Sequence, residues 1–420
     1  MTKSAFITIL VFLLLFFSVR FFLFYRNQPQ HQNGEYLSFE TRILSSPQIF
    51  SNQQRISANL DTGERILITA PMYPQFGYGD SVRISGKLQV RVLDNKKLML
   101  VMYFPKIEAN KNGKNLLLAV TGFVRQRVTL LFEKNLPPIS ASLLLGIVFG
   151  IKENMPKDFT NDLRISGVLH VVAASGMNVT MVGGFLSSIF SFFLKRQYAL
   201  VLSILGICFY ALLAGLEPSI IRASIMGILA FLAQILGRQR LAAYSLFIAA
   251  YIMLFVSPST LFDVGFQLSF MATLGLIVIR PIFDKNKKLK SLLNKSFVGE
   301  DVLTTVCAQA STLPILLANF GSYSFISVFI NGLVLWTVPV LMTLGGIGGL
   351  LGIIFEPVGA IFLYLSLPLL LYFQKVVSVF AQVFGTFNLT NFSWQFTGGY
   401  YLMLISLVIF FLQRKQAKAD

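Results

Sequence analysis

Most of this chain is a succession of apolar runs long enough to cross a lipid bilayer. Beyond residue 139, polar residues occur mainly in short breaks between these runs. The 420 residues are 55% hydrophobic and 13% charged, whereas soluble domains carry about 25% charged residues. A helix that crosses the hydrocarbon core needs about 20 apolar residues. The sequence therefore predicts a polytopic α-helical membrane protein.

The positions of the runs predict about ten spans and one re-entrant segment. Residues 5–24 are long enough to span the bilayer and lack a small-residue cleavage site, so we interpret them as an uncleaved anchor rather than a signal peptide. The run at 139–151 is too short to cross comfortably and is interpreted as re-entrant. The other spans are expected near residues 166–194, 198–215, 218–236, 241–256, 258–282, 302–318, 325–355, 358–384 and 398–413.

Residues 30–113 have the pattern of a small β domain. In the stretch VRISGKLQVRV, residues 82–92, apolar and polar side chains alternate, which predicts a strand with one buried face. Turn sequences such as DTGE and DNKK separate this run from similar runs at 36–44, 54–60, 65–70 and 98–104. Five short strands suit a small β-barrel, and an OB-like barrel is the expected form.

Residues 114–138 connect the β domain to the membrane spans. Five apolar side chains recur there at helical spacing, which predicts an amphipathic helix on the membrane surface: Leu117, Val120, Val124, Val128 and Leu131. The expected domains are therefore an anchor at 1–28, the β domain at 30–113, this interfacial helix, a membrane domain at 139–413 and a basic tail at 414–420.

The positions of the basic residues predict the topology. The loop DKNKKLKSLLNK, residues 284–295, carries five lysines against one aspartate, so it should be cytoplasmic. Counting spans from this loop puts Lys195/Arg196, Arg238/Arg240 and the tail on the same side. Both termini are then cytoplasmic and the β domain is extracytoplasmic.

The stretch LHVVAASGMNVTMVGG, residues 169–184, places polar groups inside an apolar run. His170 would lie about 6 Å inside its span, at 1.5 Å per residue. Arg222 and Asp263 lie at a similar depth, each a few residues after a proline that opens a helix. Charged groups in spans normally face each other or a cavity. We expect a polar vestibule open to the outside in which Arg222 pairs with Asp263, although an ion pair that only joins helices fits the same pattern.

Ser175 and Gly176 weaken the helix in this stretch. A broken helix would direct its backbone N–H groups into the vestibule. Close packing of the small residues against a neighbouring helix is the alternative, and the two are not exclusive. An intramembrane hydrolase that uses Ser175 and His170 is disfavoured, because the two side chains do not share a helical face.

The β domain carries the candidate DNA-binding residues. Arg83, Lys87 and Arg91 occupy the exposed face of one predicted strand, where they could contact phosphates. The adjacent loop PMYPQFGYGD supplies aromatic rings on which bases could stack, namely Tyr73, Phe76 and Tyr78. An ordinary solvated strand face and a packed loop would give the same pattern.

Few residues offer metal, redox or nucleotide chemistry. His31 and His170 are the two histidines, which nearly excludes a zinc hydrolase site. Cys208 and Cys307 fall in apolar segments and do not resemble a disulfide framework. No GxxxxGK[ST] loop for ATP is present. We therefore expect no cofactor, no metal and no catalytic residue.

Four ordered blocks resemble the ComEC competence family, the DNA-uptake channel of the bacterial cytoplasmic membrane. They are GIVFGIKENMPKDFTNDLRISGVLHVVAASGMNVTMVGGFL (146–186), YALLAGLEPSIIRASIMG (210–227), DVGFQLSFMATLG (263–275) and QASTLPILLANFGSYSFISVFINGLVLWTVP (309–339). The resemblance implies an OB-like module before the channel. It also places six of the vestibule candidates at the family's patterned positions: His170, Ser175, Gly176, Arg222, Asp263 and Gln267. Asn178 and Gln309 are the two further vestibule candidates.

Two departures from the family pattern affect the expected chemistry. Many members carry a C-terminal metallo-β-lactamase-like domain, whereas this sequence stops at Asp420. A separate nuclease is then expected to remove the strand that is not imported. Asn178 stands where the family often has a second histidine, which weakens any proposal that needs a histidine pair.

The resemblance implies uptake of single-stranded DNA across the cytoplasmic membrane during natural transformation. Besides single-stranded DNA and membrane lipids, the implied partners are a membrane-attached DNA receptor, a cytoplasmic ATP-driven motor and the separate nuclease. The sequence leaves open whether the chain forms a homo-oligomer. The alternative is a small-molecule or lipid transporter with an accessory outer domain, which would show no steep salt dependence of DNA binding.

Overall fold

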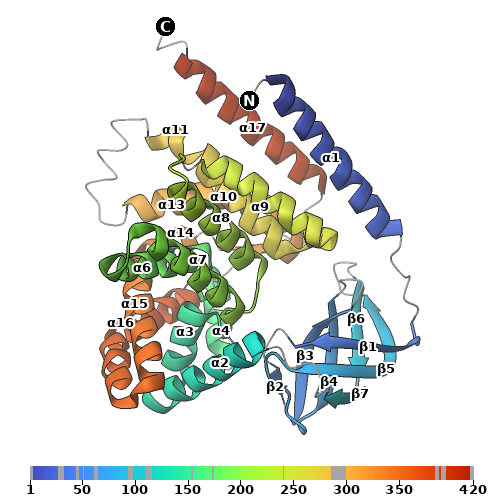
Figure 1. Cartoon of the computed structure of the whole chain (residues 1–420), viewed down its shortest axis with the longest axis vertical. Coiled ribbons are helices and arrows are strands. Elements are labelled where there is room, and N and C mark those ends of the chain that lie inside the picture. The colour runs from blue at the N-terminus through green and yellow to red at the C-terminus, as the bar shows by residue number, and fades with distance from the viewer. Residues whose placement is uncertain are drawn as a thin grey trace. The chain divides into compact units, whose positions relative to one another are not determined.

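The computed structural model divides into two compact units (Figure 1). Unit 1 comprises Met1–Val120 and Phe247–Asp263, and unit 2 comprises Thr121–Leu246 and Val264–Asp420. The structure describes residues 3–26, 33–43, 47–50, 52–60, 65–92, 98–109, 116–152, 155–172, 175–239, 241–284, 299–324, 326–383, 387–388 and 394–416.

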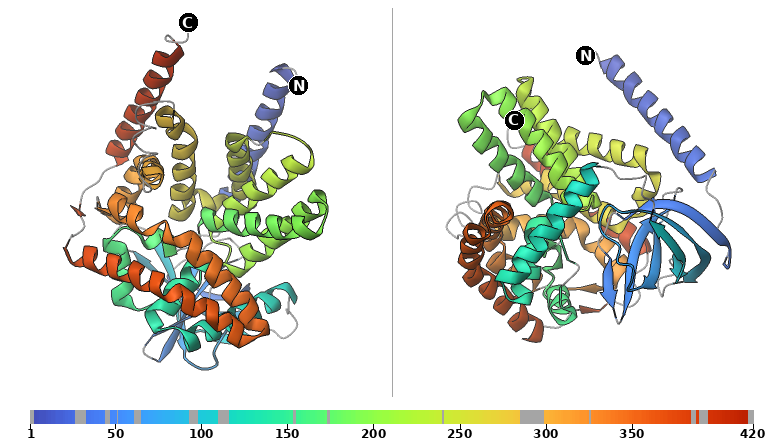
Figure 2. Two further views of the ribbon diagram at one scale, coloured as in Figure 1. Left: turned by 90° about the vertical axis from the view of Figure 1, so that its left-hand side faces the viewer. Right: turned by 60° about the horizontal axis from the view of Figure 1, so that its bottom comes forward.

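The β domain of unit 1 is one curved, seven-stranded sheet (Figure 2, right). The strand order is β1-β5-β6-β4-β3-β2, with β7 also paired to β5. The β4–β6 pair is parallel and the other pairs are antiparallel. The strands are β1 (Tyr36–Arg42), β2 (Gln48–Phe50), β3 (Gln53–Asn59), β4 (Arg65–Pro71), β5 (Ser81–Val92), β6 (Leu98–Tyr103) and β7 (Lys106–Ala109).

All five predicted strands are present in this sheet. The alternation in β5 is real, because Val82, Ile84 and Leu88 are fully buried while Arg83 and Lys87 are exposed. Burying each such side chain stabilises the fold by about 1.5–3 kcal/mol. The sequence missed β2 and β7, which have three and four residues and are too short to show an alternation.

Gly86 lies where β5 changes its partners. Residues before it pair with β1 and β7, and residues from Leu88 onward pair with β6. A Cβ on Gly86 would lie 2.8 Å from the Cβ of Pro105, so only glycine fits this close approach. One long strand can therefore join both halves of the curved sheet.

Unit 1 also holds helix α1 (Lys3–Arg26), the end of α9 (Ala242–Val256) and a short 3₁₀ helix, η2 (Pro258–Phe262). Aromatic rings join these segments. The Phe16 and Phe255 rings stack with centroids 5.3 Å apart, and the Tyr25 and Phe262 rings meet edge to face at 6.2 Å. The predicted anchor is thus a helix of 24 residues that packs through aromatic contacts.

Unit 2 is helical. Its elements are α2 (Leu116–Asn135, which begins in unit 1), α3 (Pro138–Phe149), α4 (Lys157–Ile165), α5 (Leu169–Val172), α6 (Gly176–Phe193), α7 (Arg196–Leu213), α8 (Pro218–Ile235), the start of α9, α10 (Val264–Val278), α11 (Arg280–Asp284), α13 (Gly299–Phe320), α14 (Ser327–Val334), α15 (Thr337–Ile354), α16 (Glu356–Val383), α17 (Trp394–Gln416) and the short pair β8 (Ser322–Tyr323) and β9 (Phe387–Asn388).

Among the described residues, seven helices are long and apolar enough to cross a membrane. The chain is therefore a membrane protein by this criterion, but the predicted total of about ten spans is not confirmed. The seven are Leu169–Phe193, Arg196–Leu213, Pro218–Ile235, Val264–Phe283, Gly299–Phe320, Thr337–Ile354 and Glu356–Val383. The first of them joins α5 and α6 across residues 173–174, which lie outside the described part of the chain. Shorter apolar helices cover Pro138–Phe149, Ala242–Val256 and Gln395–Phe410.

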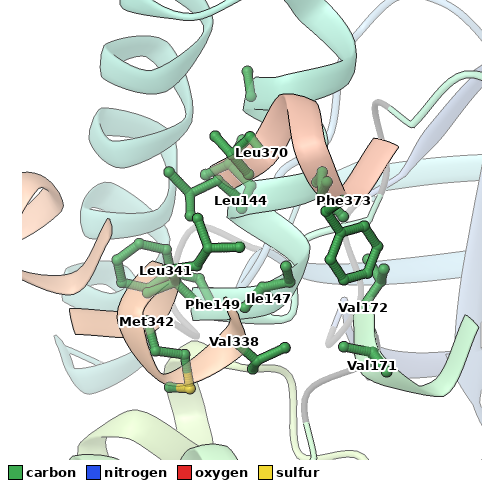
Figure 3. Close-up of a cluster of buried hydrophobic side chains, with 14 of the residues drawn as sticks. Leu144, Ile147, Phe149, Val171, Val172, Val338, Leu341, Met342, Leu370 and Phe373 are labelled. Atoms are coloured by element: carbon green, nitrogen blue, oxygen red, sulfur yellow. The ribbon is translucent and has the colours of Figure 1, made fainter. Parts of the chain in front are cut away.

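The core of unit 2 surrounds the short helix α3, in which every residue from Ser140 to Phe149 is buried. Figure 3 shows side chains of α5, α15 and α16 pointing toward those of α3. Helices α15 and α16 run side by side (Figure 2). The short helix expected at 139–151 is present and enclosed by protein, which a bilayer tolerates for segments too short to span. Its re-entrant placement stays a prediction.

The single span predicted at 325–355 is wrong. The structure has two helices there, α14 and α15, with Pro339 in the first turn of α15. Proline has no N–H for the carbonyl of Leu335 and is best accommodated in the first turn of a helix, where no such bond is needed. Thr337 donates its hydroxyl to the carbonyl of Val334 at 2.7 Å, which helps to end α14.

The predicted apolar face of the interfacial helix is only partly correct. Leu117 and Val120 are exposed, whereas Thr121 and Arg125 are buried. Arg125 Nη1 donates to the carbonyl of Leu213 at 2.6 Å, at the end of α7. A cation at a helix C-terminus is favourable. The buried face of α2 is therefore set by this polar contact as well as by apolar residues.

Candidate functional site

The outer face of β5 carries the three basic residues predicted to bind DNA. Arg83, Lys87 and Arg91 are all exposed, at every fourth position of the strand and therefore on one face. The cross-strand register decides which groups lie beside each of them, and these neighbours were not predictable from the spacing alone.

Arg83 is held by carboxylates. Its Nε and Nη2 atoms donate to Glu40 Oε1 at 3.1 and 2.5 Å, and Glu40 is its register partner on β1. On the other side, Glu108 of β7 is its register partner. Lys106 pairs with Glu108 at 2.7 Å, and this contact lowers the pKa of the Glu108 carboxyl. Arg83 is therefore a weaker phosphate contact than the sequence suggested.

Lys87 and Arg91 instead lie beside aromatic residues. The Arg91 guanidinium lies 5.3 Å from the centroid of the Tyr103 ring, a cation–π distance. Tyr36 of β1 is the register partner of Lys87, and its side chain is 65% exposed. We call these four residues, Tyr36, Lys87, Arg91 and Tyr103, the β5 patch. Neither Tyr36 nor Tyr103 stands out in the sequence as a binding residue, although both lie in predicted strands.

The loop between β4 and β5 presents one of its three aromatic residues. Tyr73 is 72% exposed, whereas Tyr78 is 8% exposed and Phe76 packs against the sheet core. The predicted stacking roles of Phe76 and Tyr78 do not fit this arrangement. Buried Gln54 holds the loop, because its Nε2 donates to the carbonyls of Pro71 and Pro74 at 2.8 and 2.7 Å and its Oε1 accepts from the Phe76 N–H at 3.3 Å.

In unit 2, the predicted weak point of the span at 166–194 is a break between two helices. Helix α5 ends at Val172, and α6 begins at Gly176 with the extended residue Ser175 before it. Residues 173–174 lie outside the described part of the chain. The first N–H groups of α6 have no partner within their own helix, as at any helix start.

Asn178 ties the start of α6 to the end of α3. Its Nδ2 donates to the carbonyl of Ile147 at 2.7 Å, and its Oδ1 accepts from the Ser175 hydroxyl at 2.9 Å. Tyr210 of α7 donates its hydroxyl to the next carbonyl, Val148, at 3.0 Å. Both carbonyls belong to the last turn of α3 and lack an intrahelical donor. Two buried side chains thus complete the C-terminal end of α3.

Arg222 of α8 lies beside the same break. The residue is 8% exposed, and its Nη1 donates to the carbonyl of Ser269 and to Thr273 on α10. Its Nη2 lies 2.9 Å from the position that a Cβ would take on Gly176. The structure therefore brings together four predicted residues, which we call the helix-break cluster: Ser175, Gly176, Asn178 and Arg222.

The remaining vestibule candidates are spread more widely. His170 Nδ1 lies 3.1 Å from the carbonyl of Gly167, which packs against Ser327. Gln309 of α13 donates to the Ser327 hydroxyl at 2.9 Å. These contacts join His170 and Gln309 through α14 rather than through the helix-break cluster.

Asp263 and Gln267 follow each other by one helical turn but belong to different units. Asp263 is the last residue of unit 1, and Gln267 is half-buried on α10 of unit 2. The pairing of Arg222 with Asp263 therefore stays a prediction.

Metal chemistry finds no support in the described part of the chain. No group of three or more His, Cys, Asp or Glu side chains suited to a metal ion occurs among the residues that the structure describes. His31 lies outside these residues. Cys208 is exposed and Cys307 is buried, and both are free thiols.

The chain is similar to a known family and to two curated proteins. Residues 147–414 match the family described as Competence protein. The chain is 28% identical over 230 residues to ComE operon protein 3 of Bacillus subtilis (strain 168), a match that covers 54% of this chain and 28% of that protein. It is 30% identical over 200 residues to an uncharacterized protein of Aquifex aeolicus (strain VF5), covering 44% of this chain and 48% of that protein.

The chain thus spans less than half the length of these curated relatives. No solved structure matches it. The family match contains the helix-break cluster and all the other predicted vestibule residues. Because that match extends over more than half of the sequence, the chain belongs to the Competence protein family.

Proposed function

We propose that this chain passes single-stranded DNA across the bacterial cytoplasmic membrane during natural transformation. Family membership supports a role in competence. The observation that carries the proposal is the β5 patch. In it, Lys87 and Arg91 lie beside exposed aromatic rings, and among the described contacts neither cation pairs with a carboxylate. Cations that follow a phosphate backbone and rings on which bases stack are the two requirements for binding single strands.

We assign the DNA contact to an OB-like β domain. The strand order supports this assignment, since the two ends of the sheet, β1 and β2, come from neighbouring segments of the chain. The Thr41 hydroxyl donates to the carbonyl of Asn59 at 3.0 Å, which links β1 to β3 and helps to close the sheet. Small barrels of this kind bind oligonucleotides on a sheet face and its neighbouring loops.

We further propose that the β domain is extracytoplasmic and that both termini are cytoplasmic. Two contacts within unit 2 support the charge-based assignment. Arg196 Nη2 donates to Gln234 Oε1 at 3.4 Å, which places the basic loops after α6 and α8 at one end of the bundle. Arg280 pairs with Glu300 at 2.7 Å, across the loop that holds the lysine cluster. That loop lies outside the described residues.

The proposed path uses the helix-break cluster after the β5 patch. Helix N-termini carry a partial positive charge, and Arg222 adds a full one beside Gly176. This potential would attract phosphates that have left the outer domain. Transport also needs an energy source, so we propose a cytoplasmic ATP-driven motor as a partner. The other proposed partners are a membrane-attached DNA receptor, a separate nuclease and the surrounding lipids.

DNA binding by the full-length protein in detergent tests this proposal. Lys87→Ala and Arg91→Ala should each weaken binding of a fluorescent oligonucleotide roughly three- to tenfold and reduce the slope of log K against log salt by about 0.7. Lys106→Ala is the matched control, because Lys106 lies on the same face but is paired with Glu108. Fluorescence anisotropy at several salt concentrations gives both quantities.

The carboxylate that holds Arg83 supplies a second, opposite prediction. Glu40→Gln removes the ion pair and releases the guanidinium for phosphate, so it should tighten binding and steepen the salt slope. Unchanged binding in Glu40→Gln, together with equal losses in Lys106→Ala and Lys87→Ala, would count against the β5 patch. Binding without any salt dependence would favour the small-molecule or lipid transporter instead.

A further inference from the structure

Helix α13 contains a proline in its interior, Pro314. Proline has no N–H, so the carbonyl four residues earlier, that of Ala310, loses its helical donor. The proline ring also crowds this carbonyl. The next carbonyl, that of Ser311, lies in the same turn of α13. In a membrane, freed carbonyls must find donors from neighbouring helices or side chains. We call residues 310–314 the proline turn.

Two consecutive tyrosines of α17 reach these two carbonyls. The Tyr400 hydroxyl donates to the carbonyl of Ala310 at 2.8 Å, and the Tyr401 hydroxyl donates to the carbonyl of Ser311 at 2.9 Å. The two rings stand nearly perpendicular, at 84°, with centroids 6.0 Å apart. Each hydroxyl therefore serves a different carbonyl of the same turn.

The proline turn lies beside a predicted vestibule residue. Gln309, directly before Ala310, donates to Ser327 of α14 at 2.9 Å. On α10, a Cβ on Gly275 would lie 2.7 Å from the carbonyl of Cys307, so α10 also packs closely against α13 here. Helices α10, α14 and α17 thus contact α13 within about one and a half turns of each other.

We propose that Tyr400 and Tyr401 are positioning residues: Tyr400 replaces the hydrogen bond lost at Pro314, Tyr401 binds the next carbonyl, and together they fix the turn of α13 that presents Gln309. The inference goes beyond the proposed function, because neither tyrosine is assigned a contact with DNA. Their part is to hold one conformation of a helix that its own backbone leaves incomplete.

A double-mutant cycle on the full-length protein in detergent tests this assignment. Tyr400→Phe with Tyr401→Phe should lower the apparent melting temperature by about 2–4 °C, since two hydrogen bonds are lost. In a Pro314→Ala background the same pair of changes should lower the apparent melting temperature much less, because an alanine at this position restores the N–H that serves the carbonyl of Ala310. Tyr364→Phe, on an exposed face of α16, is the control and should change neither background.

Transformation frequency supplies the readout that separates positioning from stability alone. At a temperature where the double tyrosine variant is fully folded, its frequency should fall while binding of oligonucleotide to the full chain stays unchanged. An equal decrease in apparent melting temperature with and without Pro314 would overturn the proposal. A double tyrosine variant with the native melting temperature and the native transformation frequency would overturn it as well. Loss of oligonucleotide binding in that variant would also contradict it.

Discussion

Replacing Gly359 with alanine is expected to prevent stable assembly of unit 2. At the crossing of α15 and α16, a Cβ on Gly359 would lie 2.6 Å from the Gly348 carbonyl oxygen and 2.7 Å from the Gly352 nitrogen. These are backbone atoms, so the clash is relieved only when the two helices separate. Overpacking of a well-packed core costs about 1–3 kcal/mol, and close contact of small residues is what joins helices within lipid.

The yield of monodisperse protein after size-exclusion chromatography in detergent measures this loss, and transformation frequency should fall with it. Gly346→Ala is the matched control, because it makes the same change on α15 at a position with nothing within 4 Å. Equal yields of the two variants would show that α15 and α16 are not packed as described.

Asn178→Leu is expected to have the largest effect among the predicted site residues. The change keeps the size of the side chain but leaves the carbonyl of Ile147 and the hydroxyl of Ser175 without their described partner. A buried group left unsatisfied costs about 1–3 kcal/mol. Because Asn178 joins the start of α6 to the end of α3, the helix-break cluster should lose its geometry and transformation should be lost.

Thr180→Val is the control for this change on the same helix. Thr180 is exposed, and its hydroxyl donates to the carbonyl of Gly176 at 3.0 Å, within its own helix. It should retain transformation, and the thermal midpoint in detergent should fall for Asn178→Leu alone. Native transformation by Asn178→Leu would show that the cluster does not depend on this residue.

The β domain was predictable because its signals are local. Alternation along the chain found all five longer strands, and the exposure of Arg83, Lys87 and Arg91 followed from it. The neighbours of these basic residues were not predictable, because they depend on the register between strands. Glu40 lies 43 residues from Arg83 in sequence, so the ion pair that holds Arg83 was not visible. The burial of Tyr78 likewise depends on contacts distant in sequence.

The membrane unit was predictable in its helices and less so in its breaks. The Ser175–Gly176 break was found because small and polar residues stand out in an apolar run. The break before α15 was missed, although Pro339 was visible within the apolar run of 325–355. The roles of Tyr400 and Tyr401 could not be found from sequence, because their acceptors lie 90 residues away on α13.

Uptake of labelled DNA tests the central claim most directly. A naturally transformable strain that lacks this gene would receive labelled duplex DNA, with the gene restored on a plasmid or left absent, and surface DNA would then be digested. The account predicts that the nuclease-protected, single-stranded label inside the cells depends on the chain, while label bound at the surface before digestion does not. Equal protected label in the two strains would contradict the proposed passage of DNA through this protein.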